Sequence, residues 1–338
     1  MAKLTVLVLR FSSIGDIVLT TPVLRGLHQQ ADAQVHVLTK SRYADLLQPN
    51  PYVHTVHTFE REVTECLPSL RALNFDHIVD LHNNLRSRRV RWSLRRPATA
   101  FDKLNVEKWL LTQLKINRLP NVHIVQRYLA TVHQFGVQPD GLGLDYFIPK
   151  MEAITPTSID SALLPNSYIA FAIGAAHATK RLPPEKLWAI CEALSPLPLV
   201  LLGGPDEQST GVALADAFSH VVNACGRTNL HGSASLIQQA RVVLSHDTGM
   251  MHIAAALRRP IVSIWGNTVP AFGMYPWLPG GLAEYVCAEV ADLDCRPCSK
   301  IGYAACPKKH FRCMREQRVE WIVEQVRRLG NYGSLTSG

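Results

Sequence analysis

No stretch of the 338-residue sequence approaches the roughly 18 uninterrupted apolar residues that a membrane-spanning helix needs. The short apolar run at the start, residues 4–9, is not followed by a small-residue cleavage site, which favours a first buried strand over a signal peptide. We therefore expect a cytoplasmic protein. The sequence also lacks internal repeats and low-complexity tracts, and its 47% hydrophobic and 18% charged residues are typical of a folded globular chain.

The charge and the cysteines limit the partners and cofactors. A formal net charge of +8 indicates an anionic partner, which could be a nucleic acid, a membrane surface or a phosphorylated substrate. No zinc-finger, RNP or helix-turn-helix pattern is present, so we expect no nucleic acid. Eight cysteines in a cytoplasmic protein argue against a disulfide framework. Two interpretations stay open for four of them, a structural zinc site or reduced loop thiols: Cys295, Cys298, Cys306 and Cys313. Otherwise we expect no cofactor.

Apolar runs and helical patterns alternate in both halves of the chain. This alternation predicts parallel strands joined by crossover helices, and a stretch rich in Pro, Thr and Ser at 144–167 separates two such units. We predict two Rossmann-like domains, residues 1–152 and 153–338, with a ligand cleft between them. The predicted strands are 4–9, 35–38, 53–56, 77–81, 168–173, 198–202, 221–223, 242–245 and 261–265. The longer predicted helices are 105–115, 122–135, 184–194, 207–218, 233–240, 249–257 and 315–329.

The first motif is Ser12-Ser13-Ile14-Gly15-Asp16, a tight turn between a strand and a helix start. It is not the GxGxxG fingerprint, so the turn does not favour an NAD-type dinucleotide site. Asp16 lies near a helix N-terminus, where a carboxylate serves either as a cap or as a general base that removes a proton from an acceptor alcohol. Both interpretations stay open on position alone.

The second motif is His246-Asp247-Thr248-Gly249-Met250-Met251-His252, again a strand, a turn and a helix start. Unpaired amides at such a helix start can bind a diphosphate, and the glycine lets a bulky anion approach. Asp247 suits a sugar hydroxyl better than a phosphate. A capped turn with no ligand is the alternative. Two further loops follow strands in the same half and add candidate donor-binding residues, namely Thr179 and Lys180 for phosphate and Glu207 for ribose hydroxyls.

Together these loops resemble glycosyltransferase family 9, the ADP-heptose:lipopolysaccharide heptosyltransferases. The resemblance rests on the Ser-Ser-Ile-Gly-Asp turn, the Thr-Lys-Arg-Leu-Pro loop at 179–183, and Asp247-Thr248-Gly249 with His252, in the family's order. It implies a GT-B fold and metal-free, inverting transfer of a sugar, expected to be heptose from ADP-heptose, to a lipopolysaccharide-type acceptor. It further implies Asp16 as base, Lys180 with Thr248, Gly249 and Met250 as phosphate ligands, and Ser13 and Gly15 beside the acceptor.

Six arginines crowd a short segment after the strand at 77–81. Spacing places Arg88, Arg91 and Arg95 on one helical face. The segment is either a solvated face or a site for an anionic glycolipid acceptor, for which we name Arg86 and Arg89. Contact with the inner membrane is expected with such an acceptor. The rival function is a non-catalytic α/β module that binds a nucleotide or nucleic acid, and demonstrated sugar transfer would distinguish the two.

Overall fold

The computed structural model describes residues 3–332, so the outermost residues of both predicted domains, 1–2 and 333–338, lie outside it. The chain forms two compact units. The first contains residues 1–104 and 122–147, and the second contains residues 105–121 and 148–338. This division differs from a single boundary after residue 152, because the helical segment 105–121 belongs with the C-terminal unit.

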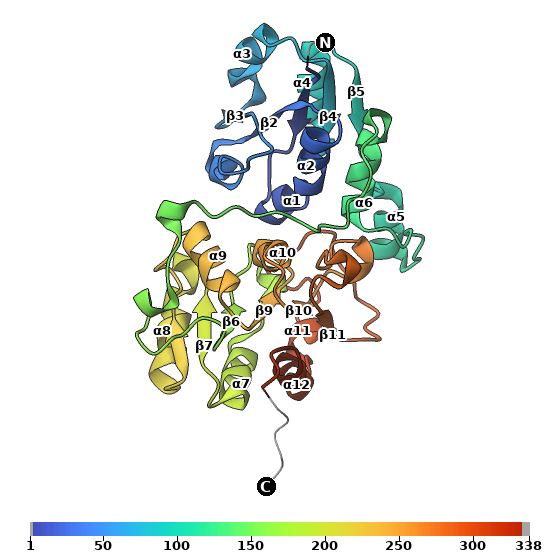
Figure 1. The fold of residues 1–338 in the computed structure, drawn as a ribbon. Coiled ribbons are helices and arrows are strands. Elements are labelled where there is room, and N and C mark those ends of the chain that lie inside the picture. Colours follow the sequence, from blue (N-terminus) through green and yellow to red (C-terminus); the bar gives the residue numbers. More distant parts are fainter. Residues whose placement is uncertain (1–2, 333–338) are drawn as a thin grey trace. The chain divides into compact units, whose positions relative to one another are not determined.

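The first unit is built on a five-stranded parallel sheet with the order β3-β2-β1-β4-β5 (Figure 1). β2 and β3 lie in succession on one side of β1, and β4 and β5 lie in succession on its other side. This reversal is a topological switch point, and the loops after β1 and β4 therefore meet at the carboxyl edge where open α/β sheets bind ligands. The strands are β1 (Thr5–Leu9), β2 (Gln34–Lys40), β3 (Thr55–Phe59), β4 (His77–Asp80) and β5 (Ala98–Ala100).

The second unit repeats this plan with six parallel strands in the order β11-β10-β9-β6-β7-β8. Its switch point lies between β6 and β9, whose carboxyl ends precede the Lys180 loop and the Asp247 loop. Each unit therefore has the Rossmann-like α/β architecture predicted from the alternation. The strands are β6 (Ile169–Ala172), β7 (Leu199–Leu202), β8 (Val221–Asn223), β9 (Val242–His246), β10 (Ile261–Trp265) and β11 (Tyr285–Glu289).

Helices pack against both sheets and bury the apolar strands. The central strands β1, β6, β7 and β9 are almost wholly buried, as expected for parallel strands covered on both faces. Among the described residues, no helix is both long enough and apolar enough to cross a bilayer. The α-helices are α1 (Ile14–Val18), α2 (Thr21–Gln29), α3 (Leu67–Ala72), α4 (Leu85–Leu94), α5 (Asn105–Trp109), α6 (Ile124–Leu129), α7 (Pro184–Leu194), α8 (Gln208–Ala217), α9 (Leu230–Gln238), α10 (Gly249–Ala256), α11 (Arg312–Arg315) and α12 (Val319–Leu329).

The sequence prediction missed two strands, and both are edge strands. β5 has only three residues, Ala-Thr-Ala, and β11 is only partly buried, so neither has the long apolar run that marks a central strand. The predicted helix 105–115 is shorter as an α-helix, because it changes to a π-helix at Leu110–Leu114. The predicted helix 315–329 begins later, at Val319, after the separate short helix α11.

Candidate functional site

Asp16 lies at the switch point of the first unit, in the turn that follows β1. It is the third residue of α1, and its Oδ2 accepts hydrogen bonds from the Ser13 hydroxyl at 2.8 Å and the Ser13 amide at 3.3 Å. Its other oxygen, Oδ1, lies 2.5 Å from the Arg10 guanidinium. The side chain is 22% exposed. Asp16 therefore helps to fix the helix start, as the capping interpretation requires, and it is also an oriented carboxylate that solvent can reach.

Arg10 anchors this carboxylate, and the sequence interpretation did not identify it. Its guanidinium also donates to the carbonyls of Ser12 (2.8 Å) and Leu81 (2.5 Å) and to the Tyr128 hydroxyl (2.8 Å). Burial by itself lowers the pKa of Arg10, but Asp16 and Tyr128 raise it overall, so the group stays charged. A permanent cation with four acceptors holds the Asp16 carboxylate in one orientation.

His82 completes the surroundings of Asp16 in the first unit. Its ring packs against Phe11 with the centroids 4.7 Å apart. Burial, followed by the positive charge of Arg10, lowers the pKa of His82 to about 3, so the ring is neutral near neutral pH. Ser13 and Gly15, predicted beside the acceptor, lie in the same turn as Asp16. The three candidate residues of the first motif therefore lie in and directly before the first turn of α1.

The second unit brings Lys180 and Asp247 together at its own switch point. Lys180 Nζ lies 2.6 Å from Asp247 Oδ2 and donates to the Asp247 carbonyl at 3.2 Å. Asp247 Oδ2 also accepts from the Thr268 hydroxyl at 2.7 Å. Lys180 has three N–H donors, and these contacts use two of them. The pair is mostly buried, with 17% of the lysine and 9% of the aspartate side chain exposed. The sequence interpretation treated the two residues separately and did not include Thr268.

The start of α10 lies beside this ion pair and is open to ligands. Thr248 is the N-cap, and residues 248–250 are partly exposed, whereas His252 is buried within the helix. His246 is the last residue of β9 and directly precedes Asp247. Its ring accepts a hydrogen bond from the Leu182 amide at 3.1 Å and so links the Asp247 loop to the Lys180 loop. Burial lowers the pKa of His246 to about 4, which makes it a neutral acceptor. The helix start thus presents unpaired amides next to a positioned lysine.

Glu207 and Thr179, which the sequence suggested as donor ligands, also form contacts that hold the surrounding loops together. The Glu207 carboxylate accepts from the Gly204 amide at 2.9 Å and lies 3.4 Å from the Arg181 guanidinium. A Cβ on Gly174 would lie 2.9 Å from the Glu207 carboxyl carbon, so this glycine lets the carboxylate rest on the end of β6. The Thr179 hydroxyl is engaged by the backbone of Tyr303. Both residues remain predictions as donor ligands.

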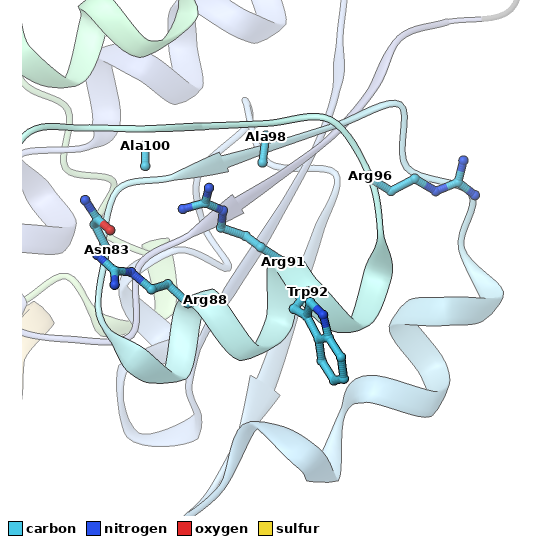
Figure 2. A pocket seen from close by; sticks show the side chains of 7 residues that line it. All are labelled: Asn83, Arg88, Arg91, Trp92, Arg96, Ala98 and Ala100. Carbon is cyan, nitrogen blue, oxygen red and sulfur yellow. The ribbon is translucent and has the colours of Figure 1, made fainter.

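A cavity of about 670 Å³ opens between α4 and β5 in the first unit. Figure 2 shows Arg91 reaching from α4 toward Ala98 and Ala100, with Asn83 and Arg88 at one end and Arg96 at the other. Neither of the two arginines named from the sequence lines it. Arg86 lies 3.5 Å from Glu62, and Arg89 is exposed elsewhere on the helix. The cavity places a different set of arginines together: Arg88, Arg91 and Arg96.

The four C-terminal cysteines lie within residues 295–313, a loop that ends in α11 and that we call the cysteine loop. All four line a single small cavity with Asn267, and all are free thiols. Within residues 3–332, however, no three His, Cys, Asp or Glu side chains are placed so that they could hold a metal ion. Burial raises the pKa of Cys313 to about 12. Structural zinc stays a prediction, to be tested by metal analysis.

Comparisons with known proteins agree with the architecture of both units. The chain is 26% identical to lipooligosaccharide heptosyltransferase 2 of Haemophilus ducreyi over 295 residues, which cover 79% of this chain and 84% of the relative. A glycosyltransferase family 9 structure from Veillonella parvula superposes with a TM-score of 0.77 at 18% identity, covering 97% of this chain and 98% of that one. ADP-heptose LPS heptosyltransferase II from E. coli superposes with a TM-score of 0.71 at 21% identity, covering 97% and 99%.

The family model described as glycosyltransferase family 9 (heptosyltransferase) matches residues 63–303, which include the Lys180 and Asp247 loops and the arginines of α4. The two Rossmann-like sheets agree with the GT-B fold of the structural neighbours. The chain therefore belongs to glycosyltransferase family 9, the heptosyltransferase family, and is a glycosyltransferase.

Proposed function

We propose that this enzyme transfers a heptose from ADP-heptose to an anionic glycolipid of the lipopolysaccharide-core type, with inversion at the anomeric carbon. The names of its relatives, lipooligosaccharide heptosyltransferase 2 and ADP-heptose LPS heptosyltransferase II, support the donor and the acceptor class. The observation that most strongly supports the chemistry is Asp16, held by Arg10 and Ser13 in the loop at a switch point.

Asp16 is the proposed general base. As the acceptor oxygen attacks the anomeric carbon, its proton passes to an Asp16 oxygen, and the new C–O bond forms on the face opposite the leaving diphosphate. Arg10 holds Oδ1 of this carboxylate, and the hydroxyl and amide of Ser13 hold Oδ2, so both oxygens have a defined orientation. The fixed contacts orient the carboxylate before the acceptor binds, which lowers the entropic cost of proton transfer.

Lys180 and the start of α10 are the proposed groups that stabilise the leaving diphosphate. When the anomeric C–O bond breaks, its electron pair goes to the departing phosphate oxygen. The remaining N–H donor of Lys180 and the amides near Thr248, Gly249 and Met250 supply positive charge there. Asp247 keeps Lys180 in place and is the proposed acceptor for a sugar hydroxyl.

Contact with the cytoplasmic face of the inner membrane is part of this proposal, since the acceptor is a lipid. The net charge of +8 suits an anionic leaflet. Flotation of the purified protein with vesicles containing anionic lipid tests this part. Equal flotation with neutral vesicles would contradict an electrostatic contact.

The experiment that tests the proposed transfer uses the purified full chain, ADP-heptose and a lipopolysaccharide-core glycolipid that lacks heptose. The expected product is a glycolipid one heptose heavier, with the anomeric configuration inverted relative to the donor, as read by mass spectrometry and NMR. A panel of other nucleotide sugars serves as the comparison, because a bound donor raises the melting temperature of the folded enzyme. Stabilisation and transfer with another sugar nucleotide, but not with ADP-heptose, would refute the donor assignment.

A further inference from the structure

The cavity between α4 and β5 is formed by side chains that the reaction at Asp16 does not use. It is lined by three arginines and one tryptophan, together with Asn83 and two small residues of β5, Ala98 and Ala100. The alanines leave space next to the strand that a larger side chain would fill. A volume of about 670 Å³ is within the range of small-ligand sites, which extends from about 300 to 1,000 Å³.

One arginine of the cavity forms an ion pair with a buried carboxylate. Arg91 lies 3.5 Å from the carboxylate of Asp80, the last residue of β4, and that carboxylate is completely buried. Asp80 is also held by the amides of His82 and Asn83, at 3.1 and 2.7 Å. The negative charge of Asp80 therefore favours this position of the Arg91 guanidinium, and Figure 2 shows the guanidinium extended toward Ala98 and Ala100. A guanidinium positioned in this way binds an anion at a lower entropic cost than a mobile one.

The other cations leave the cavity positively charged. Within residues 3–332, no carboxylate forms an ion pair with Arg88 or Arg96. Arg96 donates a hydrogen bond to a neutral partner, the side-chain Oδ1 of Asn74, at 2.9 Å. The cavity thus contains three guanidinium groups, and only that of Arg91 is paired with a carboxylate, Asp80. The remaining charge suits a carboxylate or a phosphate, which arginine binds through paired N–H donors.

Trp92 adds an apolar wall to this charged cavity. Its side chain is among the most exposed large apolar groups of the described residues, at 76%. An indole presents a flat face on which the C–H face of a sugar ring can pack, and the contact removes apolar area of both partners from water. The combination of guanidinium groups with an exposed indole suits a ring that has both a C–H face and an acidic substituent.

The topology places this cavity on the acceptor side of the proposed reaction. Asn83 is in the loop that follows β4, and β4 pairs directly with β1, whose following loop contains Asp16. From Asn83 the cavity extends along β5 and away from the switch point. A chain of sugars with its reacting hydroxyl at Asp16 would place a neighbouring acidic sugar here.

We propose that the α4–β5 cavity binds an acidic sugar of the acceptor, a ring with a carboxylate or phosphate, with Arg88 and Arg91 on the anion and Trp92 against the ring. This inference rests on the proposed function for the identity of the acceptor. The binding of a simple acidic sugar does not depend on it.

The test measures the binding of glucose 6-phosphate, glucuronate and neutral glucose to the full chain by calorimetry at low salt. At least one acidic sugar should bind with a millimolar dissociation constant, and glucose should bind at least tenfold more weakly. Arg88→Ala and Trp92→Ala should each weaken acidic-sugar binding about tenfold, since a charge-assisted hydrogen bond or a buried aromatic contributes at least that factor.

Two substitutions outside the cavity are matched controls. Arg71→Ala removes one exposed charge from α3 in the same unit, and Leu85→Ala removes an exposed apolar side chain from α4 itself. Both should leave acidic-sugar binding within twofold of the unchanged protein. Equal losses in the control and cavity variants would overturn the inference, as would the absence of saturable binding of either acidic sugar.

A membrane role for the same patch gives a different result. If Arg88→Ala and Trp92→Ala reduce flotation with phosphatidylglycerol vesicles but leave glucose 6-phosphate and glucuronate binding unchanged, the patch binds lipid and the inference is wrong. If the binding losses appear as expected while the enzyme transfers no heptose, the acidic-sugar site stands and the proposed function falls. The two failures are therefore distinguishable.

Discussion

Replacing Asp16 by asparagine should separate its chemical role from its structural one. The change keeps the size of the side chain and a carbonyl oxygen for Arg10 but removes the negative charge. A general base contributes roughly two to four orders of magnitude to turnover, so kcat should fall by about that factor. The affinity for the nucleotide sugar should change little, because the proposed donor ligands lie in the other unit.

The substitution also has a stability cost that can be approximated from the contacts of Arg10. Removing one partner of a fully buried ion pair costs about 3–5 kcal/mol. Here the Asp16 side chain is 22% exposed, and Arg10 keeps the Ser12 and Leu81 carbonyls and the Tyr128 hydroxyl. We therefore expect Asp16→Asn to lower the free energy of unfolding by about 1–3 kcal/mol. The melting temperature should fall by several degrees, and the protein should remain folded at 25 °C.

Asp140→Asn is the matched control for this loss of stability. It removes a carboxylate from Arg25, another buried arginine of the first unit, with which Asp140 forms an ion pair at 2.6 Å. Arg25 keeps its second partner, Asp145. The control should lower the melting temperature to a similar degree while kcat stays within about twofold. Turnover and melting curves of both variants check the reasoning. A kcat for Asp16→Asn within fivefold of the unchanged enzyme, or an equal fall in the control, would refute the base assignment.

Three further outcomes follow from the second unit. Lys180→Ala should weaken ADP binding about tenfold or more and leave acceptor binding unchanged, because a charged hydrogen-bond donor is lost; calorimetry that shows equal losses for both ligands would exclude a phosphate role. The pKa of His246 in the folded protein, about 4, is below its ordinary value of 6.5, so its stabilising effect is complete above pH 6.5 and is lost as the pH falls toward 4. Urea unfolding should show a loss of roughly 2 kcal/mol between pH 7.5 and pH 5 from this group, and the loss should be reduced in His246→Gln. Burial raises the pKa of Cys191 and Cys225 to about 12, so a thiol reagent should label them only after unfolding. Mass spectrometry that finds either one labelled first in the native protein, before the cysteine loop, would contradict their burial.

The sequence predicts well those parts of the fold that depend on residues close together in the chain. Central parallel strands are buried on both faces and therefore appear as continuous apolar runs, which is why β1, β6, β7 and β9 were identifiable. The turns after β1 and β9 contain Gly15 and Gly249, residues typical of strand-to-helix turns. Asp16 and Asp247 could be named as candidates because they lie in these turns, next to a helix start.

The partners of the candidate residues could not be predicted, since they are distant in the sequence. Arg10 meets Tyr128 across 118 positions, and Lys180 meets Asp247 across 67. Periodicity gives the face of a helix on which a residue lies, but it does not give the element that packs against that face. The prediction of Arg86 and Arg89 as acceptor ligands shows this limit of periodicity. Spacing grouped Arg88 with Arg91, as the structure does, but could not show that Arg86 and Arg89 would lie outside the cavity.

The two switch points explain why both motifs follow a particular strand of their sheets. At a switch point, neighbouring strands are followed by crossover connections that leave in opposite directions, so the loops above them diverge and expose the strand ends. In the first unit, this arrangement leaves the loop of Asp16 beside the loop that begins the α4–β5 cavity. In the second unit, the equivalent arrangement leaves Lys180 beside Asp247. In the second unit, a charged group from one loop therefore lies beside the residues that lead into a helix in the neighbouring loop. A switch point requires only the strand order and not a shared sequence motif, so one architecture is compatible with the proposed division of ligands, with the acceptor in one unit and the nucleotide sugar in the other.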